Sequence, residues 1–272
     1  MAVMVRTRAW LLLAALLAAA PAAARDCVVL LHGLGRGEGS MLVPAAVLAR
    51  EGYRVVAAGY DAADGTVEAI AAEVVPRSVA ECGEAERIHF VTHSMGAIVL
   101  RAWMEEHQVA RLGRTVMMAP PNRGSEVVDA LRGLGLARRV VGPAGEQLGA
   151  AAGLPARLGP VWPGVGVIAG TRSGEPWSSA LIPGPDDGKV SVASTRVAGM
   201  DDHLVLRATH TFVMNHPVAL AQTVAFLRDG VFARDLDAAE ALRFLFDRGP
   251  DAGRGARARG ALPPTPTRHG PP

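Results

Sequence analysis

Six short runs of apolar, β-type residues recur along this chain, and helix-like or loop-like sequence separates each run from the next. The runs are CVVLLHG, YRVVAAGY, RIHFVTHS, RTVMMAP, VGVIAGT and HLVLRAT. Strands that are apolar nearly throughout are buried on both faces, which is typical of a parallel sheet covered by helices. The pattern predicts an α/β fold with six strands, and 272 residues, half of them hydrophobic, suffice for one large domain.

Helical patterns fill most of the intervals between these runs. We expect helices at residues 41–51, 66–81, 95–107 and 212–228. Thr66, which follows a glycine, is a suitable N-cap for the second of them. A last amphipathic segment at residues 236–246 is expected to dock on the body of the domain.

A long insertion rich in Gly and Pro, residues 121–164, separates the fourth run from the fifth. Its first part has the spacing of an amphipathic helix, with one apolar face formed by Val127, Val128, Leu131 and Leu134. Insertions of this length in a compact domain are often functional, so we expect a cap or lid over a site. A packed surface subdomain that does not move is the alternative.

The two ends of the chain differ from the rest in composition. Arg6 and Arg8, the apolar run 10–20 and the small residues before Ala24 form the three regions of a secretory signal. We therefore expect a signal peptide at residues 1–24, cleavage after Ala24, and export to the periplasm or beyond. Residues 249–272 have almost nothing to bury and are expected to be disordered, which leaves the domain at residues 25–248.

Charge and cysteine content limit the partners and the compartment. The formal net charge of +2 becomes −3 once the two arginines of the signal and the net +3 of the tail are set aside. No clustered basic face remains, so nucleic acid is not expected as a partner. Cys27 and Cys82 each precede a predicted strand and could form a disulfide in an oxidising compartment. Two buried free thiols are the alternative.

The segment RIHFVTHSMGAIVL runs from a predicted strand directly into a predicted helix. A strand that turns at once into a helix exposes the side chain at the corner, and here that residue is Ser94. Ser94 is therefore the candidate nucleophile. It needs a base, a carboxylate that orients the base, and two N–H donors for an oxyanion.

Candidates for the oxyanion donors come from two turns. LLHGLG ends the first predicted strand in His-Gly, a turn that lends a backbone N–H to an oxyanion hole. We expect Leu34 N–H to be one donor and Met95 N–H to be the other. His32 is expected to shape the loop rather than to titrate.

The carboxylate and the base follow Ser94 in the chain. Asp187, next to a glycine in PDDGKVSVAST, is the first choice for the acid, with Asp186 as the alternative; an ordinary Asp-Gly turn would explain both. His210, in the loop after the last predicted strand, is the expected base. His203 lies at the opposite end of that strand, and His216, inside the helical pattern, is the competitor.

The order Ser94, Asp187, His210, with LHGLG upstream and THSMG at the turn, resembles the α/β-hydrolase superfamily, and more closely its small bacterial lipase-like or esterase-like serine hydrolases. The resemblance covers residues 27–228. It implies an α/β-hydrolase fold with a minimal, six-stranded, mostly parallel sheet, helices on both faces and a cap insertion. It also implies a serine mechanism with no metal and no organic cofactor.

Two features depart from the usual pattern of that superfamily. Thr92 stands where the first glycine of the turn is usual, but it is small enough for the turn to form. The domain is also expected to begin directly at the strand that ends in LHGLG, without the two antiparallel strands that commonly precede it.

The function expected from these residues is hydrolysis of carboxylic esters through an acyl-enzyme on Ser94. Leu42 and Val43 after the oxyanion turn, together with Met41 and the apolar face of the insertion, favour a hydrophobic acyl chain and a small-molecule or lipid ester. Transient contact with a lipid surface is compatible with this entrance. A thioesterase, an amidase, an acyltransferase or a non-catalytic relative that binds an acyl ligand or a partner would share much of the pattern.

Overall fold

The computed structural model describes residues 26–61 and 65–246, so the predicted signal peptide and disordered tail lie outside the described residues. Within these ranges the chain forms one six-stranded sheet in the order β2-β1-β3-β4-β5-β6, in which every pairing is parallel. The strands are β1 (Cys27–Leu31), β2 (Arg54–Ala57), β3 (Ile88–His93), β4 (Leu112–Met118), β5 (Val165–Gly170) and β6 (Asp202–Leu206). The six predicted strands are confirmed.

The order of the strands reverses between β1 and β3. The chain adds β2 on one side of β1 and then returns to place β3 on the other side. Ligands of open α/β sheets bind outside the carboxyl ends of the strands at such a reversal. The loop after β1 and the turn after β3 therefore meet where a site is expected.

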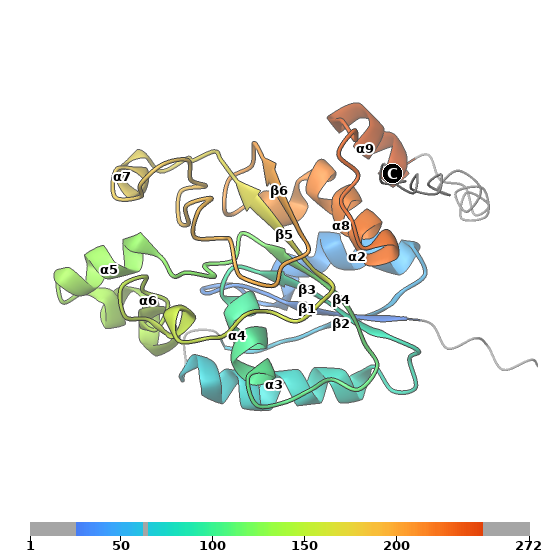
Figure 1. Cartoon of the computed structure of the whole chain (residues 1–272), viewed down its shortest axis with the longest axis horizontal. Coiled ribbons are helices and arrows are strands. Elements are labelled where there is room, and N and C mark those ends of the chain that lie inside the picture. Colours follow the sequence, from blue (N-terminus) through green and yellow to red (C-terminus); the bar gives the residue numbers. More distant parts are fainter. Residues whose placement is uncertain (1–25, 62–64, 247–272) are drawn as a thin grey trace, which may run out of the picture.

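Helices cover both faces of the sheet (Figure 1). They are α2 (Leu42–Arg50), α3 (Val67–Glu81), α4 (Met95–Met104), α5 (Glu126–Gly133), α6 (Ala137–Glu146), α7 (Pro176–Ser179), α8 (Pro217–Asp229) and α9 (Ala238–Phe246). α3 and α4 lie on one face and α2 and α8 on the other, while α5, α6 and α7 lie beyond the carboxyl edge of the sheet.

Alternate residues of β1 fill two separate cores. Val29 and Leu31 pack with α3 and α4, whereas Val28 and Leu30 pack with α2 and α8. Successive strand side chains point to opposite faces, so a strand buried on both sides is apolar at every position. This double burial explains why the strands were recognisable as continuous apolar runs.

Two helix boundaries differ by more than two residues from the sequence-based prediction. The helix expected from residue 212 begins at Pro217, because proline suits the first helical position, and a short 3₁₀ turn precedes it. The helix expected to reach residue 107 ends at Met104. Leu134 was expected on the buried face of α5 but lies just past its end and is 71% exposed. Thr66 does cap α3, where its side-chain oxygen accepts a hydrogen bond from Ala69 N at 3.2 Å.

Cys27 and Cys82 form a disulfide with a Cα–Cα distance of 5.7 Å. The bond joins the first residue of β1 to the end of α3, next to the start of β3. Of the two alternatives left open by the sequence, the structure shows the disulfide.

The C-terminal helix of the described chain, α9, docks as predicted. Ala241 and Leu245 pack against α8, and Arg50 of α2 donates a 2.5 Å hydrogen bond to the Leu245 carbonyl oxygen. None of the described helices combines the length and the apolar character needed to cross a membrane.

Candidate active site

Ser94 lies on the sharp turn between β3 and α4. Its backbone has φ 51° and ψ −122°, a positive φ that L-residues adopt only when surrounding structure holds them there. The Ser94 N–H donates to the Met118 carbonyl oxygen at 2.9 Å, which ties the corner to β4. A Cβ at Gly96 would lie 2.5 Å from the Leu31 carbonyl oxygen, so only glycine lets α4 start this close to β1.

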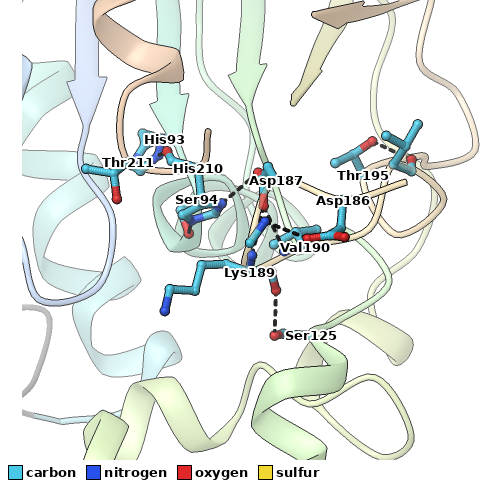
Figure 2. Close-up of polar contacts among 12 residues, drawn as sticks. His93, Ser94, Ser125, Asp186, Asp187, Lys189, Val190, Thr195, His210 and Thr211 are labelled. Carbon is cyan, nitrogen blue, oxygen red and sulfur yellow. Dashed lines mark hydrogen bonds and ion pairs between the residues drawn. The ribbon is translucent and has the colours of Figure 1, made fainter. Parts of the chain in front are cut away.

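Ser94, His210 and Asp187 form a chain of hydrogen bonds (Figure 2). His210 Nε2 lies 2.9 Å from Ser94 Oγ, and His210 Nδ1 lies 2.8 Å from Asp187 Oδ2. A carboxylate only accepts, so Nδ1 carries the ring proton and Nε2 is free to accept one from Ser94. The structure brings together the three residues that the sequence placed in this role.

Asp187 and not Asp186 faces His210. Asp187 is 2% exposed, and its Oδ1 accepts the backbone N–H groups of Lys189 at 3.0 Å and Val190 at 2.9 Å. Asp186 Oδ1 instead accepts hydrogen bonds from Ser179 Oγ and Gly188 N, both at 2.7 Å. These two bonds stabilise the turn that contains both aspartates. Of the two carboxylates that the sequence left open, Asp187 is the one that forms a hydrogen bond with His210.

The two expected oxyanion donors lie on the two turns that flank Ser94. Leu34 follows the end of β1 and Met95 follows Ser94 itself. Among the described residues, neither N–H has a hydrogen-bond acceptor, so both are available to a ligand. A Cβ at Gly33 would lie 3.1 Å from Ser94 Cβ, which shows how closely the first turn approaches the nucleophile.

Two buried histidines support these turns. His32 stacks on Tyr60 with ring centroids 3.9 Å apart, and the Tyr60 hydroxyl donates to the His32 carbonyl oxygen. Burial lowers the pKa of His32, as expected for a residue that shapes the loop. His93 Nε2–H donates to the His210 carbonyl oxygen at 2.9 Å, and burial lowers the pKa of His93 to about 3, so its ring stays neutral.

Sequence reasoning missed the part played by His93. Its ring reaches the backbone of His210 on one side, and on the other its Nδ1 lies against Gly33 of the oxyanion turn. The available signal was a histidine at the last position of a buried strand, because a buried polar ring needs a partner.

The other histidines considered as bases lie elsewhere. His203 is in β6, where its Nε2 lies 2.9 Å from Thr195 Oγ1, and burial lowers its pKa to about 4. His216 was expected inside a helix but precedes α8 as its N-cap residue. Within residues 26–61 and 65–246 no group of His, Cys, Asp and Glu side chains is arranged to hold a metal ion.

The insertion borders the site from the side of α6. The Leu34 side chain approaches Gly145 of α6, and Ser125 Oγ donates to the Lys189 carbonyl oxygen at 3.0 Å. Ser191 Oγ likewise donates to Glu126 Oε1 at 3.1 Å. The insertion is therefore joined both to the oxyanion turn and to the loop that carries Asp187.

An apolar entrance was expected from three residues after the oxyanion turn. One of them is buried and two are exposed. Met41 is buried in the core, whereas Leu42 is 68% exposed and Val43 is also exposed. Phe212, two residues after His210, is exposed as well.

Solved structures with a similar fold include lipases and esterases. The mature lipase of Bacillus licheniformis has a TM-score of 0.60 at 16% identity, over 77% of this chain and 94% of that one. Lipase B of Aspergillus fumigatus has a TM-score of 0.58 at 16% identity, over 80% of this chain and 56% of that one. A metagenomic carboxyl esterase has a TM-score of 0.55 at 20% identity, over 82% of this chain and 75% of that one. No family model and no curated protein matches the chain.

Proposed function

We propose that this chain, which has the α/β-hydrolase fold of the lipases and esterases it resembles, is a serine hydrolase of carboxylic esters. The observation that carries the proposal is the pair of hydrogen bonds through His210, at 2.9 Å to Ser94 Oγ and 2.8 Å to Asp187 Oδ2. A fold by itself does not imply an activity, whereas this arrangement of side chains supplies a nucleophile, a base and a carboxylate that orients the base.

In the first half of the reaction, Ser94 Oγ attacks the acyl carbon of the ester while His210 Nε2 takes its proton. Asp187, which is buried and held by two backbone N–H groups, stabilises the resulting imidazolium. The carbonyl oxygen becomes an oxyanion and accepts from the N–H groups of Leu34 and Met95. The C–O bond of the ester then breaks, and the departing alcohol takes the proton from His210.

In the second half, water attacks the acyl carbon of the Ser94 ester. His210 accepts a proton from this water and returns it to Ser94 Oγ when the acyl bond breaks, which releases a carboxylic acid. The neutral ring of His93 adds no positive charge beside the imidazolium that forms twice in each cycle.

The preferred acyl group is a hydrophobic chain. Exposed apolar side chains occur on segments that adjoin the site, both after the oxyanion and His210 turns and on the insertion. They are Leu42, Val43, Leu134, Leu136, Val140 and Phe212. Exposed apolar residues on several neighbouring segments favour an apolar ligand and transient contact with a lipid surface. The protein acts after export, since disulfides such as Cys27 to Cys82 persist in oxidising compartments.

Labelling with a fluorophosphonate probe tests the nucleophile. We expect the wild-type protein to be labelled, Ser94→Ala and His210→Ala to be unlabelled, and His216→Ala, the matched control histidine, to be labelled normally. Hydrolysis by Ser94→Ala should fall by at least about 10⁴-fold. An unlabelled but folded wild-type protein, or a label on another serine, would contradict the proposal.

A panel of substrates tests the chemical class. Nitrophenyl esters from acetate to octanoate should be cleaved with a kcat/KM that rises with chain length, and faster than the matched thioesters and amides. A maximum at acetate would contradict the hydrophobic acyl chain, and a preference for thioesters or amides would contradict the ester.

A further inference from the structure

A groove of about 460 Å³ lies beside α4, away from the Ser94 turn. The loop after β4, the end of the insertion and the loop before β6 form its other walls. Arg101, which lines it, follows Ser94 by seven residues along α4, so the two are roughly 10 Å apart along the helix axis. The groove is therefore a separate place from the site described above.

Arg101 is a buried cation at this groove. It is 3% exposed, and its guanidinium donates to the carbonyl oxygens of Asn122 at 2.9 Å and Gly159 at 3.0 Å. Its Nε has no partner, and no carboxylate of the described chain forms an ion pair with it. Glu105, whose charge does reach it, instead accepts from Gly159 N at 2.8 Å. A buried charge is costly unless an opposite charge compensates it, so a negative ligand would be favoured here.

Two more arginines line the groove from adjacent loops. Arg123 N donates to the Ser194 carbonyl oxygen at 2.9 Å, and Asn122 Nδ2 donates to the Thr195 carbonyl oxygen at 2.8 Å. These bonds hold the loop of Arg123 against the loop of Arg196. Within the described ranges neither arginine side chain makes a hydrogen bond or an ion pair, and no acidic residue lines the groove.

Three arginines line this one groove, and they indicate the charge of its ligand. Two exposed arginines alone would be ordinary surface charges, but here they flank a third that is buried and forms no ion pair with a carboxylate of the described residues. A single carboxylate would compensate one of them, whereas a phosphate ester carries up to two negative charges and several oxygens that match the guanidinium fork. Pro155, Pro160 and Val197 add apolar wall for an organic group.

We propose that this groove binds a phosphate ester, either as a small soluble molecule or as the headgroup of a phospholipid. Neither source requires the reaction at Ser94, so the Ser94→Ala variant keeps the groove intact and prevents hydrolysis of a lipid probe. All measurements below use this variant as the parent protein.

The test compares two double variants that lose the same charge. Arg123→Gln with Arg196→Gln removes the two exposed arginines of the groove, and Arg87→Gln with Arg243→Gln removes two exposed arginines elsewhere. Arg101 is left in place because its hydrogen bonds hold the surrounding loops. Calorimetric titration with glycerol 3-phosphate at constant ionic strength tests the soluble source, and flotation with phosphatidylglycerol vesicles tests the headgroup.

A soluble phosphate ester is supported if glycerol 3-phosphate binds saturably to the parent protein and if two further results follow. Its affinity should be at least about tenfold weaker in the Arg123→Gln, Arg196→Gln variant, and it should be unchanged in the Arg87→Gln, Arg243→Gln control. Vesicle binding that depends on the same arginines, without binding of glycerol 3-phosphate, supports a headgroup. The proposal is overturned if neither probe binds, or if both double variants lose binding equally or keep it equally. Since the parent protein is inactive by design, this outcome is independent of the proposed ester hydrolysis.

Discussion

Replacing Asp187 by Asn should nearly abolish turnover while keeping the fold. Asn has the shape of Asp, and its Oδ1 can still accept the Lys189 and Val190 N–H groups at 3.0 and 2.9 Å. Its NH₂ group, however, would face His210 Nδ1 in place of Oδ2. Nδ1 must then accept a hydrogen bond, the ring proton moves to Nε2, and His210 loses the lone pair that faces Ser94 Oγ.

The size of the effect follows from the burial of Asp187. The side chain is fully buried, so no water replaces the lost carboxylate, and the imidazolium formed in the reaction loses its partner. In serine hydrolases with this arrangement such an exchange lowers kcat by about 10⁴-fold, which corresponds to about 5 kcal/mol of activation free energy.

The adjacent residue provides a matched control for this experiment. Asp186→Asn keeps the Oδ1 that accepts from Ser179 Oγ and Gly188 N, so we expect less than about a threefold change in kcat/KM. Both variants should be measured with a nitrophenyl ester, and their thermal unfolding should be recorded alongside. If folded Asp187→Asn kept a tenth of the activity or more, or if Asp186→Asn lost as much as Asp187→Asn, the assignment of the carboxylate would be wrong.

Three further predictions concern the framework of the site. Gly96→Ala should destabilise the fold by about 1–3 kcal/mol and lower kcat, because the new Cβ would lie 2.5 Å from the Leu31 carbonyl oxygen; unchanged urea unfolding would contradict this. Burial lowers the pKa of His93 from 6.5 to about 3, so below pH 6.5 the unfolded chain binds a proton that the folded chain excludes. The free energy of unfolding should therefore decrease as the pH is lowered from 6.5 toward 3, by up to about 1.4 kcal/mol per pH unit from His93 alone. In urea titrations over this range, His93→Gln should lose less stability per pH unit than the wild type. Equal slopes for the two proteins would refute this prediction. Replacing Cys27 and Cys82 by Ser opens a loop with a sequence separation of 55 and should cost about 4 kcal/mol of unfolding free energy, measured by denaturant titration, where a loss below about 1 kcal/mol would count against the bond.

The fold could be predicted from the sequence because strands that are buried on both faces consist of continuous runs of apolar residues. Val28 to Leu31, for example, are apolar at every position since each faces one of two cores. Helix ends carry a weaker signal, because a single residue such as Pro217 decides the boundary against a helical pattern that extends beyond it.

The candidate site was predictable in residue type and order but not in orientation. Asp186 and Asp187 are neighbours in one turn, and only the folded loop decides which carboxylate turns toward His210. The roles of His93 and Arg101 depend on contacts with residues distant in the chain, such as the His210 and Gly159 carbonyl oxygens. A polar residue inside an apolar run indicates that it has a hydrogen-bond partner in the fold, but the sequence does not identify that partner.

The attachment of the insertion has a consequence for engineering the protein. Ser125 and Glu126 join its base to the loop that carries Asp187, and Ser125 N also donates to the Leu148 carbonyl oxygen at 2.7 Å. An exchange of the whole insertion for that of another hydrolase would therefore disturb the carboxylate together with the entrance. A narrower graft, limited to residues 134–144, would leave these attachments and the contact of Gly145 with Leu34 in place, so that the entrance could be redesigned separately.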